Sequence, residues 1–339
     1  MDHVRQIAQA VLYEGYLLWP YRESSLKNRH RWTIGGVHPE AYGRAHDGNP
    51  WRMRTECLVE AEPGDTVDVR VRFLHVVTRG VPDKDGLEQD VPEQDGPERD
   101  GPERDGPDAG ARRPSGEEAQ ERELSMPGLL LEELPHDPVR TTIDIPAGRQ
   151  RRPHAGAVTL CGWEALSGRI EVSAQSLRPG LFRVAVEVVN TTPWPGGARG
   201  DAMRRTLVSA HTVLYAPRAR FVSLMDPPDD LREHAEGCRN EGVWPVLAGP
   251  EGDRHTVLAA PIILYDHPQI APESPGDLFD ATEIDQLLTL GVLALSDQEQ
   301  QEIREGDPRA REILDRCAAL TPDDLMRLHG LMRRTGPRA

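Results

Sequence analysis

The stretch Gly168-Arg-Ile-Glu-Val-Ser-Ala-Gln-Ser-Leu-Arg-Pro-Gly-Leu-Phe-Arg-Val-Ala-Val-Glu-Val-Val-Asn190 specifies the fold more directly than any other part of this chain. Apolar and polar residues alternate from Ile170 to Gln175, and they alternate again from Phe182 to Val188. This period of two is typical of strands with one buried face. Because Pro179-Gly180 lies between the two runs and favours a turn, the stretch predicts an antiparallel β-hairpin.

Several other runs have the composition of short strands. The clearest is Thr66 to Thr78, in which valines and Phe73 alternate with charged residues. Many short strands separated by turns favour antiparallel sheets. We therefore predict an α+β protein with an antiparallel β-sandwich or open-barrel-like body, whose strands include residues 51–60, 66–78, 157–163, 168–190, 206–215, 220–224 and 257–264.

Both ends of the chain have helical patterns. Residues 3–12 place Val4, Ile7 and Val11 at helical spacing. Beyond residue 274, four segments combine helix-capping residues with apolar residues at helical spacing, at 283–295, 296–305, 307–320 and 321–332. The predicted organisation is a β-rich body at residues 1–81 and 123–274, an insertion at 82–122, and a C-terminal helical bundle at 275–339.

The insertion carries an imperfect five-residue repeat from Asp85 to Ala109, rich in Asp, Glu, Gly and Pro. Residues 82–122 hold 14 acidic and six basic residues, so they account for half of the net charge of −16. The repeat offers almost nothing to bury, and its Pro and Gly oppose both helix and strand. We predict that it is disordered and that its deletion leaves function intact.

Composition argues against a nucleic-acid-binding protein, a membrane protein and a disulfide-rich protein. The net charge of −16 opposes binding to nucleic acid or anionic lipid. No apolar run reaches the roughly 18 to 20 residues of a membrane helix, and the first residues do not form a signal peptide, so we expect a cytoplasmic protein without membrane insertion. The four cysteines are far apart in sequence, which predicts neither a disulfide framework nor a zinc ribbon.

Aromatic and basic residues are concentrated near the start of the chain. Seven of the 16 aromatic residues lie between Tyr13 and Trp51, the others being Tyr16, Trp19, Tyr21, Trp32 and Tyr42. Aromatic rings next to Arg and Lys are typical of the residues that anchor a protein interface. Such rings also occur in hydrophobic cores, and the basic residues also suit an exposed loop with no ligand. The predicted binding residues are Tyr13, Glu14, Tyr16, Trp19, Tyr21, Arg22, Lys27, Asn28, Arg31 and Trp32.

The sequence contains no strong catalytic, cofactor or metal signature, so we predict no catalytic residue and no cofactor. A metal site built from His30, His38 or His46 with Cys57 is a weaker hypothesis, because their spacing does not match a helical ligand pair. Cys238 is the best candidate for a reactive thiol, since the neighbouring cation would depress its pKa.

Two motifs resemble an uncharacterised bacterial family that is encoded beside the genes of high-affinity uptake nickel-iron hydrogenase. They are Val11-Leu12-Tyr13-Glu14-Gly15-Tyr16-Leu17-Leu18-Trp19-Pro20-Tyr21-Arg22, with Lys27-Asn28 and Arg31-Trp32, and the later Leu278-Phe279-Asp280 with Glu283-Ile284-Asp285. The resemblance implies an accessory or assembly role for a hydrogenase, and it implies no reaction.

The resulting hypothesis is a non-catalytic accessory protein that binds a hydrogenase subunit or maturation factor through residues 13–32. The alternative is an enzyme that holds a small anionic substrate in a pocket lined by Glu14, Tyr16, Tyr21, Arg22 and Lys27, with His30 or Cys57 nearby.

Overall fold

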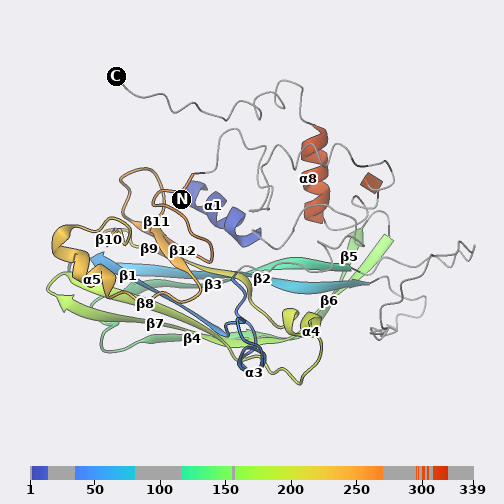
Figure 1. Ribbon diagram of the computed structural model, residues 1–339, viewed down its shortest axis with the longest axis horizontal. Helices are drawn as coiled ribbons and strands as arrows, with labels where there is room; N and C mark the ends of the chain where they lie inside the picture. The colour runs from blue at the N-terminus through green and yellow to red at the C-terminus, as the bar shows by residue number, and fades with distance from the viewer. Residues whose placement is uncertain are drawn as a thin grey trace, which may run out of the picture.

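The computed structural model describes residues 2–13, 35–80, 116–154, 157–269 and 308–319, together with five single positions between 295 and 304. Two antiparallel sheets make up most of this part (Figure 1). The strands of one sheet lie above those of the other, and buried side chains from both sheets form a shared core. The expected antiparallel β-rich body is therefore confirmed.

The first sheet has five strands in the order β10-β1-β8-β7-β4. Its centre is the predicted hairpin, in which Ser173 of β7 pairs with Ala185 of β8. Inward side chains such as Val172, Val184 and Val186 are fully buried, while alternate positions face outward. The strands are β1 (Arg52–Glu60), β4 (Val139–Ile145), β7 (Leu166–Arg178), β8 (Leu181–Asn190) and β10 (Arg220–Val222).

The second sheet runs in the order β11-β12-β9-β2-β6-β5, and β3 pairs along the length of β2. Val67, Val69, Val71 and Phe73 of β2 point into the shared core, as their alternation predicts. The strands are β2 (Thr66–Gly80), β3 (Gly116–Leu130), β5 (Gly148–His154), β6 (Ala157–Trp163), β9 (Val208–Tyr215), β11 (Trp244–Leu247) and β12 (Thr256–Ala260).

The predicted N-terminal helix is α1 (Asp2–Tyr13), which packs on the outer side of the second sheet. Its apolar face, formed by Val4, Ile7, Ala8 and Val11, lies over β9 and β2 and shares one buried cluster with Val246, Ala248, Leu258 and Ala260. The remaining described helices are α3 (Glu40–Ala45), α4 (Arg199–Met203), the 3-10 turn η1 (Asp229–Leu231), α5 (Arg232–Glu236) and α8 (Pro308–Ala318).

Two sequence predictions need revision or fall outside the described residues. The predicted insertion ends at residue 122, which is wrong, because residues 116–122 belong to β3. At the C-terminus, α8 falls within the predicted helix 307–320. The predicted helices 283–295 and 321–332 lie wholly or mostly outside the described residues. Of 296–305, positions 297, 300, 301 and 304 are described and are helical, and the described part does not show a bundle.

Candidate functional site

The predicted aromatic-basic binding stretch lies almost entirely outside the described residues. Tyr13 is the last residue of α1, and the description resumes at Gly35, whose carbonyl accepts a hydrogen bond from the backbone of Ala210. Both ends of the stretch are therefore anchored on the second sheet. The other nine predicted binding residues lie outside the described residues, and they are Glu14, Tyr16, Trp19, Tyr21, Arg22, Lys27, Asn28, Arg31 and Trp32.

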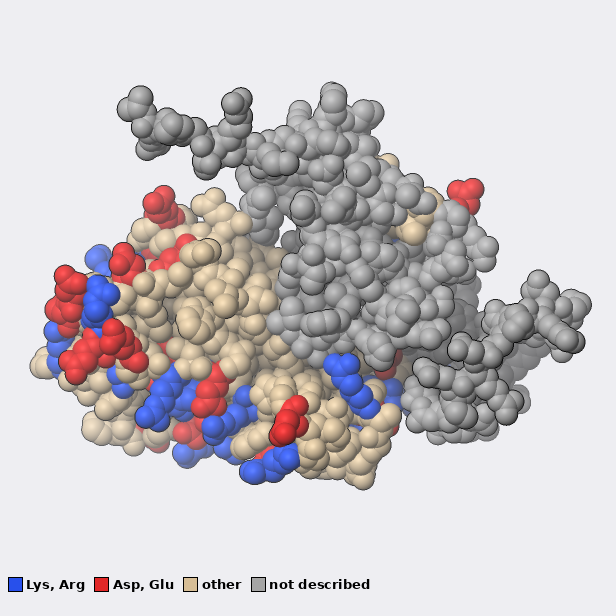
Figure 2. All heavy atoms as spheres, viewed as in Figure 1, with Lys and Arg blue, Asp and Glu red and all other residues tan. Residues whose placement is uncertain are grey.

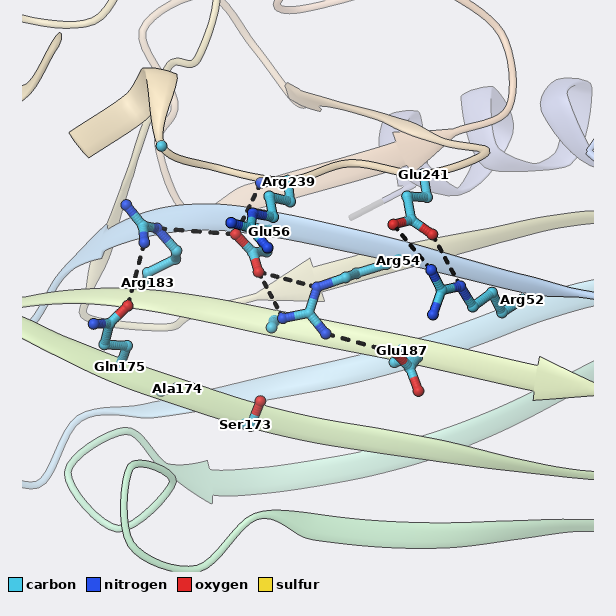
Figure 3. Close-up of a pocket in the computed structure, with 12 residues that line it drawn as sticks. Arg52, Arg54, Glu56, Ser173, Ala174, Gln175, Arg183, Glu187, Arg239 and Glu241 are labelled. Carbon is cyan, nitrogen blue, oxygen red and sulfur yellow. Dashed lines mark hydrogen bonds and ion pairs between the residues drawn. The ribbon is translucent and has the colours of Figure 1, made fainter. Parts of the chain in front are cut away.

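The described part presents a different candidate site, a charged groove of about 510 Å³ on the outer face of the first sheet (Figure 3). Its side chains come from three adjacent strands and from the loop that follows α5. They are Arg52, Arg54 and Glu56 of β1, Ser173, Ala174 and Gln175 of β7, Arg183, Ala185 and Glu187 of β8, and Gly237, Arg239 and Glu241 of the loop.

The floor of the groove is low because two small residues, Ala185 and Ser173, lie opposite each other on neighbouring strands. Ala185 of β8 pairs with Glu56 on one side and with Ser173 on the other. The neighbouring rows contain long side chains, with Arg54 opposite Glu187 in one row and Arg183 in the other. Small side chains between two rows of long ones leave a hollow across the sheet.

Glu56 organises the charges of this groove. It is 6% exposed, and its carboxylate accepts two hydrogen bonds from Arg54, at 3.0 and 2.6 Å. The backbone N–H of Arg239 donates to the same carboxylate at 2.8 Å. Asn240 adds a second link, because its side-chain oxygen accepts from the backbone of Glu56 at 2.9 Å. The loop is therefore fixed against β1 by a buried charge and an amide.

The remaining arginines differ in how completely they are paired. Arg52 binds Glu241 at 3.0 Å. Arg183 donates to Gln175 and to the carbonyl of His234, but its Nε is buried without a hydrogen-bond partner. The side chain of Arg239 is exposed, and among the described residues its guanidinium has no hydrogen-bond or ion-pair partner. The groove thus retains unused donors on Arg239, whereas Arg183 contributes its charge with most of its donors engaged and its Nε 3.9 Å from Glu56.

An apolar surface lies beside the edge of the second sheet. Four large apolar side chains in the described part are exposed, Met225 (42%), Trp244 (49%), Ile263 (81%) and Tyr265 (78%). Residues 262–265 alternate, so that Ile262 and Leu264 pack inward while Ile263 and Tyr265 face outward. We call these four side chains the apolar edge.

The apolar edge is held together by Asp266. The carboxylate of Asp266 accepts hydrogen bonds from the backbone N–H of Leu247 in β11, at 2.8 Å, and from the hydroxyl of Ser223. Ser223 in turn accepts from the backbone N–H of Met225. Asp266 therefore joins three segments that are distant in sequence, and each of them carries an exposed apolar residue.

The apolar edge and the groove are neighbours. Glu241 lines the groove and forms a backbone bridge with Arg54, and Trp244 begins β11 three residues later. Figure 2 shows charged side chains gathered over β1 and β8, with a largely uncharged area over β11 and β12 next to them. Apolar side chains beside a charged rim are typical of protein interfaces.

The histidines named in the metal hypothesis pack against an aromatic ring. Tyr42 stacks on His46 with ring centroids 4.2 Å apart and on His38 at 5.5 Å, and Trp194 meets the Tyr42 ring edge-on. Cys57 is 1% exposed in the core. No group of three or more metal-binding side chains converges in the described residues, and His30 lies outside them. The hypothesis that His38 and His46 share a metal with Cys57 is not supported there.

The prediction for Cys238 is wrong. Burial raises the pKa of its thiol, and the nearby Arg183, which acts in the opposite direction, does not compensate. Cys238 packs against the cluster of Leu58, Leu181 and Val222. Burial also raises the pKa of Cys57, so neither thiol favours the thiolate form that a nucleophile requires. For the alternative enzyme hypothesis, Cys57 is thus removed as a catalytic partner.

The groove was not found from the sequence, although one signal was present. Arg52, Arg54 and Glu56 alternate along β1 and therefore share its outer face. Nothing in the sequence brings β8 or the 237–241 loop beside them. The sequence also gives no reason to expect four separate segments to meet there.

Comparisons with known proteins add no identification. No protein-family model matches the chain, and no curated protein matches it as a relative. Among the described residues, none of the helices combines the length and the apolar run that are needed to cross a bilayer.

Proposed function

We propose that this protein is a cytoplasmic, non-catalytic accessory protein that binds a protein partner during the assembly of a nickel-iron hydrogenase. The observation that carries the binding function is the apolar edge beside the charged groove. Four large apolar side chains are exposed on segments that Asp266 joins, which favours a protein interface over an isolated solvent-exposed surface. The hydrogenase as partner is supported by the resemblance of residues 11–32 and 278–285 alone.

The described residues that line the groove favour binding over catalysis. None of them is a histidine or a cysteine, and the carboxylate of Glu56 is already engaged by Arg54 and Arg239. A general base needs a free acceptor within hydrogen-bond reach of the proton that it removes. The groove offers positioned donors and charge, which are the elements of recognition.

Co-purification with hydrogenase structural subunits tests this function. The tagged wild-type chain should recover a subunit, and Trp244→Ala should reduce recovery at least about tenfold, because central aromatic anchors contribute most of the affinity of an interface. Trp19→Ala with Arg22→Ala tests the contribution of residues 13–32 in the same experiment. Arg151→Ala, at an exposed position on β5, is the matched control and should bind as the wild type does.

Two results would count against the proposal. One is the recovery of no hydrogenase subunit by the wild-type chain. The other is equal recovery by the wild type, Trp244→Ala and the Trp19/Arg22 double variant.

A further inference from the structure

We infer that the charged groove binds one carboxylate of the partner protein, an Asp or Glu side chain or a C-terminus, through the guanidinium of Arg239, next to the charge of Arg183. This inference rests on the proposed binding function and names the chemistry that the groove recognises.

The side chains that line the groove have a net charge of +1. Four arginines line it, Arg52, Arg54, Arg183 and Arg239, against the three glutamates Glu56, Glu187 and Glu241. Three of these arginines have carboxylates within 4 Å, whereas the guanidinium of Arg239 has no such partner among the described residues. In a chain of net charge −16, this exposed and unpaired arginine gives the groove a local positive charge.

The charge balance of the groove favours a carboxylate over a phosphate. A guanidinium presents two parallel N–H groups that match the two oxygens of a carboxylate. A single negative charge would neutralise the groove. A phosphate dianion would leave the groove with a net negative charge, and Glu56, Glu187 and Glu241 would repel it more strongly than they repel a carboxylate.

The hollow also has the size and shape for an inserted side chain. Its floor is Ala185 and Ser173, and Ser173 and Gln175 add neutral polar groups beside the arginines. Sites for free small molecules are mostly apolar and enclosing, and this groove is polar and open. Trp244 lies three residues after Glu241, which lines one end of the groove. A partner protein that covers Trp244 can therefore place one of its carboxylates in the groove.

The groove is already organised to receive such a charge. Arg54 and the backbone of Arg239 are both held by Glu56, and Arg183 is held by Gln175 and by the carbonyl of His234. Fixing these donors before binding reduces the entropy that is lost when a partner arrives. Arg239 differs in that only its backbone is fixed, so its side chain is available to the ligand.

The test uses two blocked peptides and the full-length protein. The first peptide is acetyl-Gly-Gly-Glu-Gly-Gly-amide, and the second has Gln in place of Glu and is otherwise identical. Binding is followed through the NMR signals of the backbone amides of residues 237–241. The Glu peptide should cause saturable shifts and bind at least about tenfold more tightly than the Gln peptide, and its binding should weaken as salt is raised.

Three protein variants localise the effect. Arg239→Ala should abolish the preference for the Glu peptide, Arg239→Lys should retain part of it because the charge remains, and Arg151→Ala should behave as the wild type does. Because Arg239 and Arg151 are both exposed, these variants should fold normally.

The inference is overturned if the 237–241 signals do not move, if Glu and Gln peptides bind equally, or if Arg239→Ala keeps the preference. Tighter binding of inorganic phosphate than of the Glu peptide would overturn the assignment to a carboxylate. None of these measurements needs a hydrogenase subunit, so this inference and the proposed function can fail separately.

Discussion

At the scale of single residues, the groove depends on Glu56. Its carboxylate is buried, and it is shared between Arg54, Arg183 and the backbone of Arg239. Glu56→Ala leaves these donors without an acceptor, so the free energy of unfolding should fall by about 2–4 kcal/mol. Urea unfolding monitored by circular dichroism measures this change.

The matched control is Glu60, the other glutamate on the outer face of β1. Its side chain is 44% exposed, and it pairs with Arg254 at 2.7 Å. Glu60→Ala should cost less than about 1 kcal/mol, because exposed ion pairs contribute little. Equal losses in the two variants would mean that burial of Glu56 is not what makes it important.

Two buried histidines predict a dependence of stability on pH. Burial, together with Arg122 for His75 and Arg72 for His211, lowers the pKa of each to about 4. In the unfolded chain they bind a proton below about pH 6.5. Protonation therefore favours the unfolded state, and this part of the stability is complete above about pH 6.5 and is lost as the pH falls toward 4.

His211→Gln removes one of the two titrating groups. The loss of unfolding free energy between pH 7.5 and pH 4.5 should be smaller in this variant than in the wild type, by up to about 3 kcal/mol. Urea unfolding at several pH values gives both curves. If the two curves run parallel, His211 is not responsible for the acid sensitivity.

At the scale of elements, α1 owes its place to its apolar face. Ile7 is 4% exposed and packs with Val246, Leu258 and Ala260. Ile7→Ala should lower the free energy of unfolding by about 2–4 kcal/mol, since it leaves a cavity. Gln6→Ala, one residue earlier on the exposed face, should change it by less than about 0.5 kcal/mol. Similar effects at both positions would contradict the described packing.

The elements with clear alternation were the ones that the sequence predicted. Residues 168–190 form the β7–β8 hairpin because an apolar run, Ile170 to Ala174 in β7 and Phe182 to Val188 in β8, occupies one side of each strand. β3 was missed because its inner positions carry Glu118, Gln120 and Arg122, which lie opposite Val77, His75 and Phe73 of β2. A strand whose buried side is polar lacks the period-two signal.

The sites were harder to predict than the strands. The apolar edge depends on Asp266 joining β11 to the turn that contains Ser223, and no local pattern encodes that contact. The groove likewise needs the register that places Ala185 between Glu56 and Ser173. Local composition predicts an element, whereas a site made from several elements depends on their packing.

At the scale of the whole molecule, the acidic repeat connects neighbouring strands. Arg79 of β2 pairs with Gly116 of β3, so the two ends of the connection lie side by side. Replacing residues 85–109 by a short Gly-Ser linker should change the free energy of unfolding by no more than about 1 kcal/mol, because loop-closure entropy varies slowly with length. Thermal unfolding measures this, and a large loss of stability would show that the repeat contributes to the fold.

The central claim is that the apolar edge and the charged groove form one binding surface for a hydrogenase subunit. Hydrogen–deuterium exchange of the full chain, with and without the purified subunits, tests this most directly. We predict that added subunits slow exchange at residues 237–247 and 261–267 while β4, at the far side of the first sheet, keeps its rate. Unchanged exchange at 237–247 and 261–267 in the presence of excess subunit would contradict the account.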